Sequence, residues 1–374
     1  MGGVYYFTDS LRQTLRATAF LDPAFVGGPF AAYAADQYNT PKQTSHNQAV
    51  FGDVRYAFLD GWTLDLGARY TRETKSIHGM AFANFPGFDT GWFQTIGGPG
   101  QPNSYITNTW SAPTGRVAVE WKPGTDVMTY LSWSHGFKSG GYNGMAMNDV
   151  SELGPYDQER GNTFELGAKT TWLDGKLSAN AALFLNKIRN LQVLDTVVQG
   201  GIAFFYVRNA ANGTSKGAEF ELRAQPTERW YASLGVGLLN TKYDKYILPA
   251  GTDYTGEEFI NSPKFSADAA IQYSIPMFGG VLAPLVNLSY KTHVWTHDAH
   301  RPGLDEIAGY GLIDATIPWT SGSKSWEFAI WGRNLGNKRY YLQTVGNYAT
   351  VSGAAVSYHA TPRTYGVRVS YAFK

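Results

Sequence analysis

Three histidines and an aspartate lie close together near residue 300. His293, His297 and His300, with Asp298 between the last two, form the densest group of metal-ligating residue types in the sequence. Imidazole and carboxylate groups bind zinc and other transition metals, so the spacing decides whether the group could hold one ion. In an extended strand His293 and His297 would share a face about 13 Å apart, which is too far unless the chain folds back. We therefore interpret the segment as a polar loop in which His297 and His300 are candidate ligand contacts.

A second group of candidate contacts is aromatic. Phe88, Trp92 and Phe93 lie within a long stretch that lacks regular alternation, and Tyr142 follows a pair of glycines in another such stretch. Exposed rings can stack on a ligand, although the same rings can also pack a loop on itself. Both interpretations remain open, and we take these four residues as candidate ligand contacts.

Composition excludes several kinds of chemistry. The chain has no cysteine, which excludes disulfides, a catalytic thiol and a cysteine-ligated metal. No phosphate-binding glycine loop, nucleophile elbow or metalloprotease helix occurs. The 31 basic and 30 acidic residues nearly cancel, which argues against a nucleic-acid partner. We expect no catalytic residues, no cofactor and no resident metal, and therefore no enzyme.

The elements that position these residues are predicted to be β-strands. No apolar run approaches the length of about 18 residues that a membrane-spanning helix needs. Apolar and polar residues instead alternate along most of the chain, which is typical of strands with two different faces. The last strand is the clearest case, and its apolar face carries Tyr365, Val367, Val369, Tyr371 and Phe373.

The polar faces of these strands carry charges that distinguish two all-β folds. Asp65, Arg69, Arg116 and Glu120 would face water outside a soluble β-sandwich, or a wet lumen inside a wide antiparallel barrel. Aromatic residues near strand ends, such as Trp62, Trp110 and Trp121, would form the interfacial girdles of a barrel. We favour the transmembrane barrel.

The connections support that choice, because short turns alternate with long stretches. The short turns lie at 60–61, 123–124, 174–175, 226–227, 277–279 and 321–322, and the long stretches cover roughly 11–43, 76–104, 139–157, 247–261, 296–306 and 343–360. Short turns on one side and long loops on the other are typical of outer-membrane barrels. The pattern predicts about fourteen strands, with the C-terminus on the short-turn side.

Five segments, in order along the chain, resemble the TonB-dependent receptor family of outer-membrane proteins. They are SWSHGFKSGGYNG (132–144), YDQERGNTFELGAKTTWLDGKLSANAALF (156–184), RNAANGTSKGAEFEL (208–222), GRNLGNKRYY (332–341) and PRTYGVRVSYAF (362–373). Each is weak alone, but their order makes the resemblance specific. Within them Glu159, Glu165, Lys169, Lys216 and Glu219 are candidates for lumen-facing ion pairs.

The resemblance implies a barrel of about 22 strands, of which fourteen would be only the C-terminal part. It also implies an N-terminal plug and a short box that contacts the energy-transducing TonB complex, and neither can be read in this sequence. We therefore expect residues 1–374 to be a barrel domain without its plug. The start of the chain does not read as a secretory signal, so we expect either a mature chain or a missing N-terminal region.

The function that the resemblance implies is active uptake of a ferric siderophore or a similar nutrient across the outer membrane of a Gram-negative cell. The implied partners are outer-membrane lipid, the nutrient, the TonB complex and the barrel assembly machinery. The end of the chain resembles the signal that this machinery recognises, and the matching residues are Thr364, Gly366, Val369, Tyr371 and Phe373.

Two other functions remain open. A complete fourteen-stranded barrel would be a passive channel, and a lipase-like barrel would be an outer-membrane enzyme. A closed small barrel requires the first strand, near residues 1–10, to pair with the last one. Because that first strand is short, we expect an open or strained seam between the two.

Overall fold

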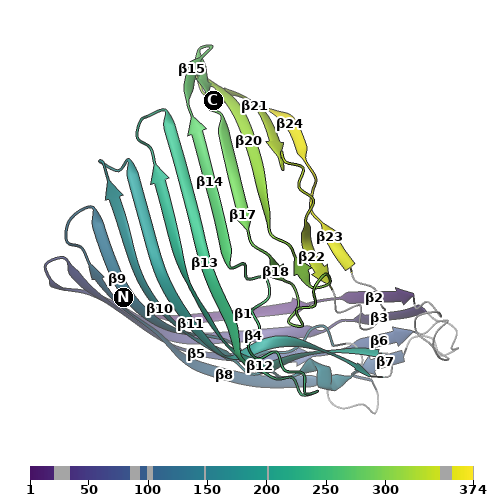
Figure 1. The fold of residues 1–374 in the computed structure, drawn as a ribbon. Coiled ribbons are helices and arrows are strands. Elements are labelled where there is room, and N and C mark those ends of the chain that lie inside the picture. The colour runs from purple at the N-terminus through teal and green to yellow at the C-terminus, as the bar shows by residue number, and fades with distance from the viewer. Residues whose placement is uncertain are drawn as a thin grey trace.

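The chain folds into an antiparallel all-β structure in the computed structural model (Figure 1). The structure describes residues 1–20, 34–84, 93–98, 104–146, 149–199, 202–345 and 356–373. One short 3-10 helix, η1 (Val150–Leu153), is the only helical element in these ranges. None of the helical structure in the described part is long and apolar enough to cross a membrane.

One sixteen-stranded sheet dominates the fold, and it curls into a deep open trough (Figure 1). Two of its strands form a small hairpin, β15 (Ile275–Met277) and β16 (Gly280–Leu282). The other fourteen follow one another in chain order, which confirms the number predicted from the turns. They are β1 (Gly2–Arg12), β4 (Lys42–Leu59), β5 (Trp62–His78), β8 (Tyr105–Trp121), β9 (Val127–Lys138), β10 (Glu159–Trp172), β11 (Leu177–Gln199), β12 (Ile202–Ala224), β13 (Trp230–Tyr246), β14 (Phe265–Tyr273), β17 (Leu285–Lys291), β20 (Tyr310–Ser321), β21 (Trp326–Arg333) and β24 (Thr364–Tyr371).

The alternation read from the sequence separates the two faces of this sheet. Apolar side chains on the outer, convex face are strongly exposed, as Leu131 and Leu183 show at 59% and 57% of their area. At the level of this apolar belt the inner face carries charged pairs, and Arg368 of β24 donates to Glu327 of β21 at 2.6 Å. Exposed apolar residues on one continuous face are rare in a water-soluble protein, so the outer face requires an apolar environment.

The six predicted short turns all lie at the same end of the sheet. Left-handed backbone conformations make the reversals possible, with φ values of +73° at Gly61 and +85° at Gly175. Glycine adopts this conformation without steric cost because it has no Cβ. The last strand also ends on this side, since the N–H of Ala372 donates to Ser325 beside the β20–β21 turn.

The long connections contain more structure than predicted. We expected irregular stretches, but pieces of them form three small sheets at the loop end of the trough. Their strands are β2 (Leu15–Phe20), β3 (Ala34–Asn39), β6 (Ala81–Asn84), β7 (Phe93–Ile96), β18 (Val294–Trp295), β19 (Glu306–Ile307), β22 (Tyr341–Val345) and β23 (Val356–His359). The prediction failed because strands this short show little alternation and depend on partners that lie in other loops, as β3 depends on β6.

The first and last strands of the sheet are not joined. In the described residues β1 pairs with β4 alone and β24 with β21 alone. The structure therefore confirms the expected open seam, but the reason given for it was wrong, because β1 is 11 residues long and not short. Each edge leaves a row of backbone N–H and C=O groups without a strand partner.

Aromatic pairs line the short-turn end of the sheet. The rings of Trp62 and Trp121 stack with centroids 5.6 Å apart, and Trp326 contacts Tyr371 at 4.6 Å. These pairs fit the predicted girdle. Trp110 does not, because it is 7% exposed and lies in a buried cluster near the loops. That assignment was wrong because closeness to a strand end does not decide which face a residue occupies.

Candidate functional site

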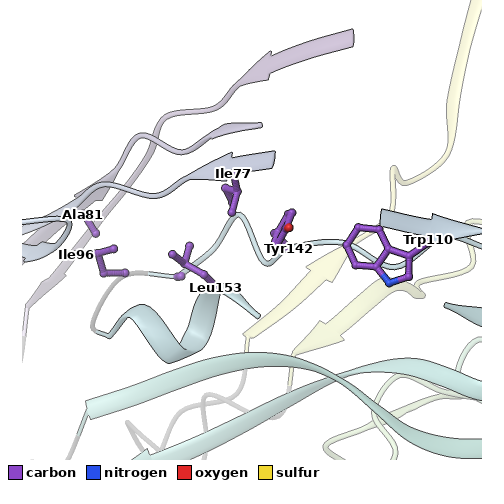
Figure 2. Packing of buried hydrophobic residues seen from close by; sticks show 7 residues of the cluster. Ile77, Ala81, Ile96, Trp110, Tyr142 and Leu153 are labelled. Carbon is purple, nitrogen blue, oxygen red and sulfur yellow. The ribbon is translucent and has the colours of Figure 1, made fainter. Parts of the chain in front are cut away.

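The loop end of the sheet contains the described candidate contacts, and Tyr142 lies in its best-packed part. Figure 2 shows the cluster that surrounds Tyr142, which includes Ile77, Trp110 and Leu153. Tyr142 is only 5% exposed, and its hydroxyl donates to Asn108 Oδ1 at 2.9 Å. Burial raises its pKa to about 12, so the hydroxyl stays protonated as a donor. Tyr142 thus fixes the loop that follows β9 onto the sheet.

The same loop is held by a buried carboxylate. Glu152 of η1 accepts hydrogen bonds from the backbone N–H groups of Asp149 at 2.9 Å and Phe205 at 3.0 Å. Asp149 caps the helix in return, since its side chain accepts from the backbone N–H of Ser151. From another loop, Asn39 donates to the carbonyl of Gly144 at 2.7 Å. These bonds join the loop after β9 to the start of β12 and to the end of β3.

The histidine segment folds into a compact turn rather than an extended strand. The ring of His300 stacks on Trp295 with centroids 4.7 Å apart, and its Nδ1 lies 2.7 Å from Glu257 Oε2. Arg301 forms two side-chain hydrogen bonds to the buried carboxylate of Asp305, at 2.7 and 3.0 Å. The chain does fold back here, since the N–H of His300 donates to the carbonyl of His297 at 3.2 Å.

Asp298 anchors this turn to the rim of the sheet. Tyr243 donates to its Oδ1 at 2.8 Å, and Tyr246 donates to its Oδ2 at 3.0 Å. Both tyrosines belong to a buried cluster with Val193 and Ala211. The turn at 296–305 is therefore joined to β13 by two charge-assisted hydrogen bonds.

The electrostatics of the turn favour a neutral histidine beside an ionised aspartate. Burial lowers the pKa of His297, whose Nδ1 accepts a hydrogen bond from the N–H of Ala299 at 3.1 Å. Burial alone would raise the pKa of Asp305, but hydrogen bonds from Arg301 outweigh it and lower that pKa. Within the described ranges no group of three histidine, aspartate or glutamate side chains is arranged to hold a metal ion.

The structure brings some of the candidate contacts together and not others. His297 and His300 share one turn, whereas Tyr142 belongs to a separate cluster. Phe88 and Trp92 lie outside the described residues, and of Phe93 only the backbone in β7 is described.

A hollow of about 550 Å³ lies in the inner wall beneath these loops, and sequence reasoning did not find it. Its polar lining includes Lys138, Glu159, Thr163 and Asn186. Glu159 lies 3.3 Å from Lys138 Nζ and accepts from the N–H of Gln192 at 2.8 Å. A polar ligand that enters from the loop end would meet a carboxylate, an ammonium and hydroxyl groups here.

The predicted lumen-facing ion pairs form only in part. Glu159 pairs with Lys138, but Glu165 accepts from the hydroxyl of Tyr130 at 2.7 Å. Lys216 was assigned to the wrong face: it pairs with Leu185 in the ladder and lies on the outer side. Glu219 is three positions further along the same strand, so the two side chains must point to opposite faces.

A family of known proteins has this arrangement of strands. The family described as "TonB dependent receptor-like, beta-barrel" matches residues 2–335. The chain belongs to this family. The family consists of outer-membrane receptors and transporters rather than enzymes, so its members' shared architecture accounts for the polar inner wall and the exposed apolar outer face.

Two curated relatives show how far the similarity extends. The metal-pseudopaline receptor CntO of Pseudomonas aeruginosa is 23% identical over 299 residues, which cover 79% of this chain and 37% of the relative. The probable TonB-dependent siderophore receptor PiuA of Acinetobacter baumannii is 24% identical over 311 residues, which cover 77% and 36%. The chain thus spans well under half the length of these relatives.

Solved structures of TonB-dependent receptors share the fold. The ferric yersiniabactin uptake receptor FyuA of Yersinia pestis aligns with a TM-score of 0.73 at 16% identity, over all of this chain and 55% of that chain. PiuA of Acinetobacter baumannii aligns with a TM-score of 0.68 at 17% identity, over 99% of this chain and 56% of that chain.

Proposed function

We propose that this chain is the barrel part of an outer-membrane TonB-dependent receptor that takes up a ferric siderophore or a similar metal chelate. The observation that carries the proposal is the family match over residues 2–335, on a sheet with a charged inner wall. The relatives named above are receptors for a metal chelate and a siderophore, and this supports a chelate as the nutrient here.

The open seam supports a larger barrel than this chain forms alone. In lipid each backbone N–H and C=O needs a partner, so a spanning sheet has to close on itself. Here β1 and β24 both present unpaired edges. We propose that residues 1–374 form one barrel domain and that further strands of the receptor complete it, with a plug that connects it to the TonB complex.

Uptake would begin at the loop end. A chelate would first meet the ordered loops, where His297 and His300 are the candidate contacts, and would then reach the inner-wall hollow with Lys138 and Glu159. Lys138 offers a cation to an anionic chelate, and its side chain is 64% exposed. Gln192 and Lys138 hold the Glu159 carboxylate in place, so the wall is shaped before a ligand arrives.

A passive channel is the second candidate function, and the seam argues against it. A complete small barrel would need a ladder between β1 and β24, and the described residues form none. An outer-membrane enzyme has no support from the family, which consists of receptors and transporters.

The test is uptake by whole cells. The gene is deleted from its host, and entry of radiolabelled iron is measured with a panel of ferric siderophores, in the presence and absence of a functional TonB protein. We expect the deletion to abolish uptake of one chelate, and loss of TonB to have the same effect. Uptake that persists without TonB would contradict active transport and favour a channel.

Location is tested separately by membrane fractionation. The protein should sediment with the outer membrane and retain β-sheet circular dichroism in detergent. Recovery as a soluble monomer without detergent would contradict the proposal.

A further inference from the structure

Five basic residues stand on the outer face where four neighbouring strands run from the apolar belt toward the loops. They are Arg160 of β10, Lys187 and Arg189 of β11, Lys216 of β12 and Lys242 of β13. All five are exposed, and none forms an ion pair with another described residue. A cluster of unpaired cations at this height is a binding surface for anions.

The ladder registers bring these cations close together. Lys187 of β11 pairs with Thr214 of β12, and Thr214 pairs with Lys242 of β13. The two lysines therefore lie at the same level, with one strand between them. Their Cα atoms are about 10 Å apart at the usual strand spacing. Arg160 and Arg189 are themselves a cross-strand pair. The nearby acidic group, Asp244, accepts a hydrogen bond from Thr214 at 2.6 Å.

An apolar groove begins on the same face, toward the short turns. Its volume is about 500 Å³, and small residues (Ala168, Ala181, Ala218) lie between larger ones (Leu166, Leu183, Leu238) along its length. A second hollow of about 610 Å³ shares Ala218 and Leu238 with the groove and is lined by Lys216. An apolar slot thus continues directly into the cationic surface.

We propose that this face binds an anionic lipid, with its phosphate headgroup on Lys187, Lys216 and Lys242 and one acyl chain in the groove. The inference uses the proposed location in a membrane, which makes the outer face lipid-facing, and goes beyond the transport function. Basic residues at the edge of an apolar belt bind anionic headgroups because the negative phosphate attracts the ammonium groups and accepts charge-assisted hydrogen bonds from them. Lysine stems lie along apolar surface while their ammonium groups reach the headgroup level.

The groove is what distinguishes a lipid from an acidic protein partner. An acidic segment would need the cations alone, whereas a lipid needs cations and an apolar slot next to each other. Ala168 and Ala181 are cross-strand partners, and Ala218 lies on the next strand opposite Leu183. These three alanines lack the side-chain bulk that leucine and phenylalanine provide elsewhere on the belt.

The test measures lipid binding to the detergent-solubilised full chain by native mass spectrometry. Phosphatidic acid, whose headgroup is a bare phosphate, is titrated against phosphatidylcholine with the same acyl chains. We expect phosphatidic acid to bind at least about tenfold more tightly, from the attraction of several cations to one phosphate. Equal affinity for the two lipids would overturn the proposal, and this comparison needs no variant.

Two sets of substitutions locate the site. Lys187→Gln, Lys216→Gln and Lys242→Gln together should remove the preference for phosphatidic acid. The matched control, Lys122→Gln, Lys176→Gln and Lys324→Gln, removes three exposed lysines at the short-turn end and should retain it. If both triple variants bind alike, the cationic surface is not the site.

The groove is tested with one more pair. Ala181→Trp fills the groove and should weaken phosphatidic acid binding several-fold, whereas Ala179→Trp, one outward position nearer the turn, should not. If both tryptophan variants weaken phosphatidic acid binding equally, the acyl chain does not lie in the groove. Binding of polyglutamate that depends on the three lysines, without a preference for phosphatidic acid, would identify an acidic protein partner instead. Absence of the protein from the outer-membrane fraction contradicts the proposed receptor, whereas a folded chain in detergent with no phosphate preference contradicts only this inference.

Discussion

The ring of Tyr130 lies across Gly167 on the inner face of the sheet. The two residues are cross-strand partners, and a Cβ placed on Gly167 would come within 2.4 Å of the ring. The ring fills the space that a side chain at this position would otherwise occupy, and its hydroxyl is held by Glu165 at 2.7 Å. The glycine is therefore required by the position of the tyrosine, in an arrangement known from other sheets as aromatic rescue of glycine.

The first prediction follows from this contact. Gly167→Ala should destabilise the sheet by about 1–3 kcal/mol, because the methyl group forces the Tyr130 ring out of its place. The measurement is unfolding in urea from detergent micelles. Gly136→Ala is the control, since a Cβ there would meet no atom within 4 Å. Similar losses of stability in both variants would contradict the proposed steric conflict.

The second prediction concerns the anchor of the turn at 296–305. Asp298→Ala leaves the hydroxyls of Tyr243 and Tyr246 without their acceptor and should destabilise the turn by about 1–3 kcal/mol. Hydrogen exchange of residues 296–305 should become faster, while the sheet exchanges at its original rate. Tyr246→Phe removes one of the two bonds and should have a smaller effect. Unchanged exchange in Asp298→Ala would show that the turn is held by other contacts.

The third prediction is a pH dependence of the same turn. Because burial lowers the pKa of His297 in the folded state, the neutral ring contributes stability that is present above its unfolded pKa, about 6.5. This stability is lost as the pH falls from there toward the lower folded value. Protonation of Nδ1 also removes the acceptor of the Ala299 N–H.

Hydrogen exchange of residues 296–305, corrected for the intrinsic rate, should therefore accelerate on acidification below about pH 6.5. His297→Gln should remove that step. A second loss is expected in more acidic solution, below about pH 3.8, where Asp305 loses the stability that its lowered pKa provides. If His297→Gln still shows the same acceleration of exchange on acidification, another group causes it.

The fourth prediction tests the assembly signal at the end of the chain. Phe373 is 90% exposed and its ring meets that of Tyr371 at 4.9 Å. An exposed aromatic residue with so few contacts adds little to folded stability, so its role is expected in recognition. Phe373→Ala should reduce the amount of protein inserted in the outer membrane, as seen by quantitative immunoblotting of membrane fractions. Tyr365→Ala removes an exposed ring from the preceding strand β24 and should insert normally. Equal loss of inserted protein in both variants would contradict a specific signal.

The sequence predicted the strands and turns well because local rules determine them. Alternation in β24 and the glycine turns at Gly61 and Gly175 depend only on neighbouring residues. The predicted number of about fourteen strands therefore agrees with the fourteen chain-ordered strands of the sheet. The sequence also shows that Lys216 and Glu219 lie on opposite faces, since they are three positions apart in one strand. Lys216 was assigned to the inner face from the family resemblance, although the alternation of side chains along the strand places it on the outer face.

The loops could not be predicted in the same way. Tyr142 looked like an exposed contact, but its neighbours Ile77 and Trp110 come from strands far away in the sequence. The inner-wall hollow likewise combines residues from several strands, and the only local signal for it was the charge of Glu159. Whether His297 and His300 touch a ligand stays a prediction.

The chain-ordered pairing of the long strands has a consequence for the route by which the protein folds. Alternate long ladders, such as β10 with β11 and β12 with β13, join strands separated by one short turn. Closing such a short loop costs little chain entropy, so each hairpin can form soon after its residues are available. Small sheets such as the pair β3 and β6 join more distant segments and should form later. The trough is thus suited to stepwise growth, in which every finished edge serves as the template for the next hairpin.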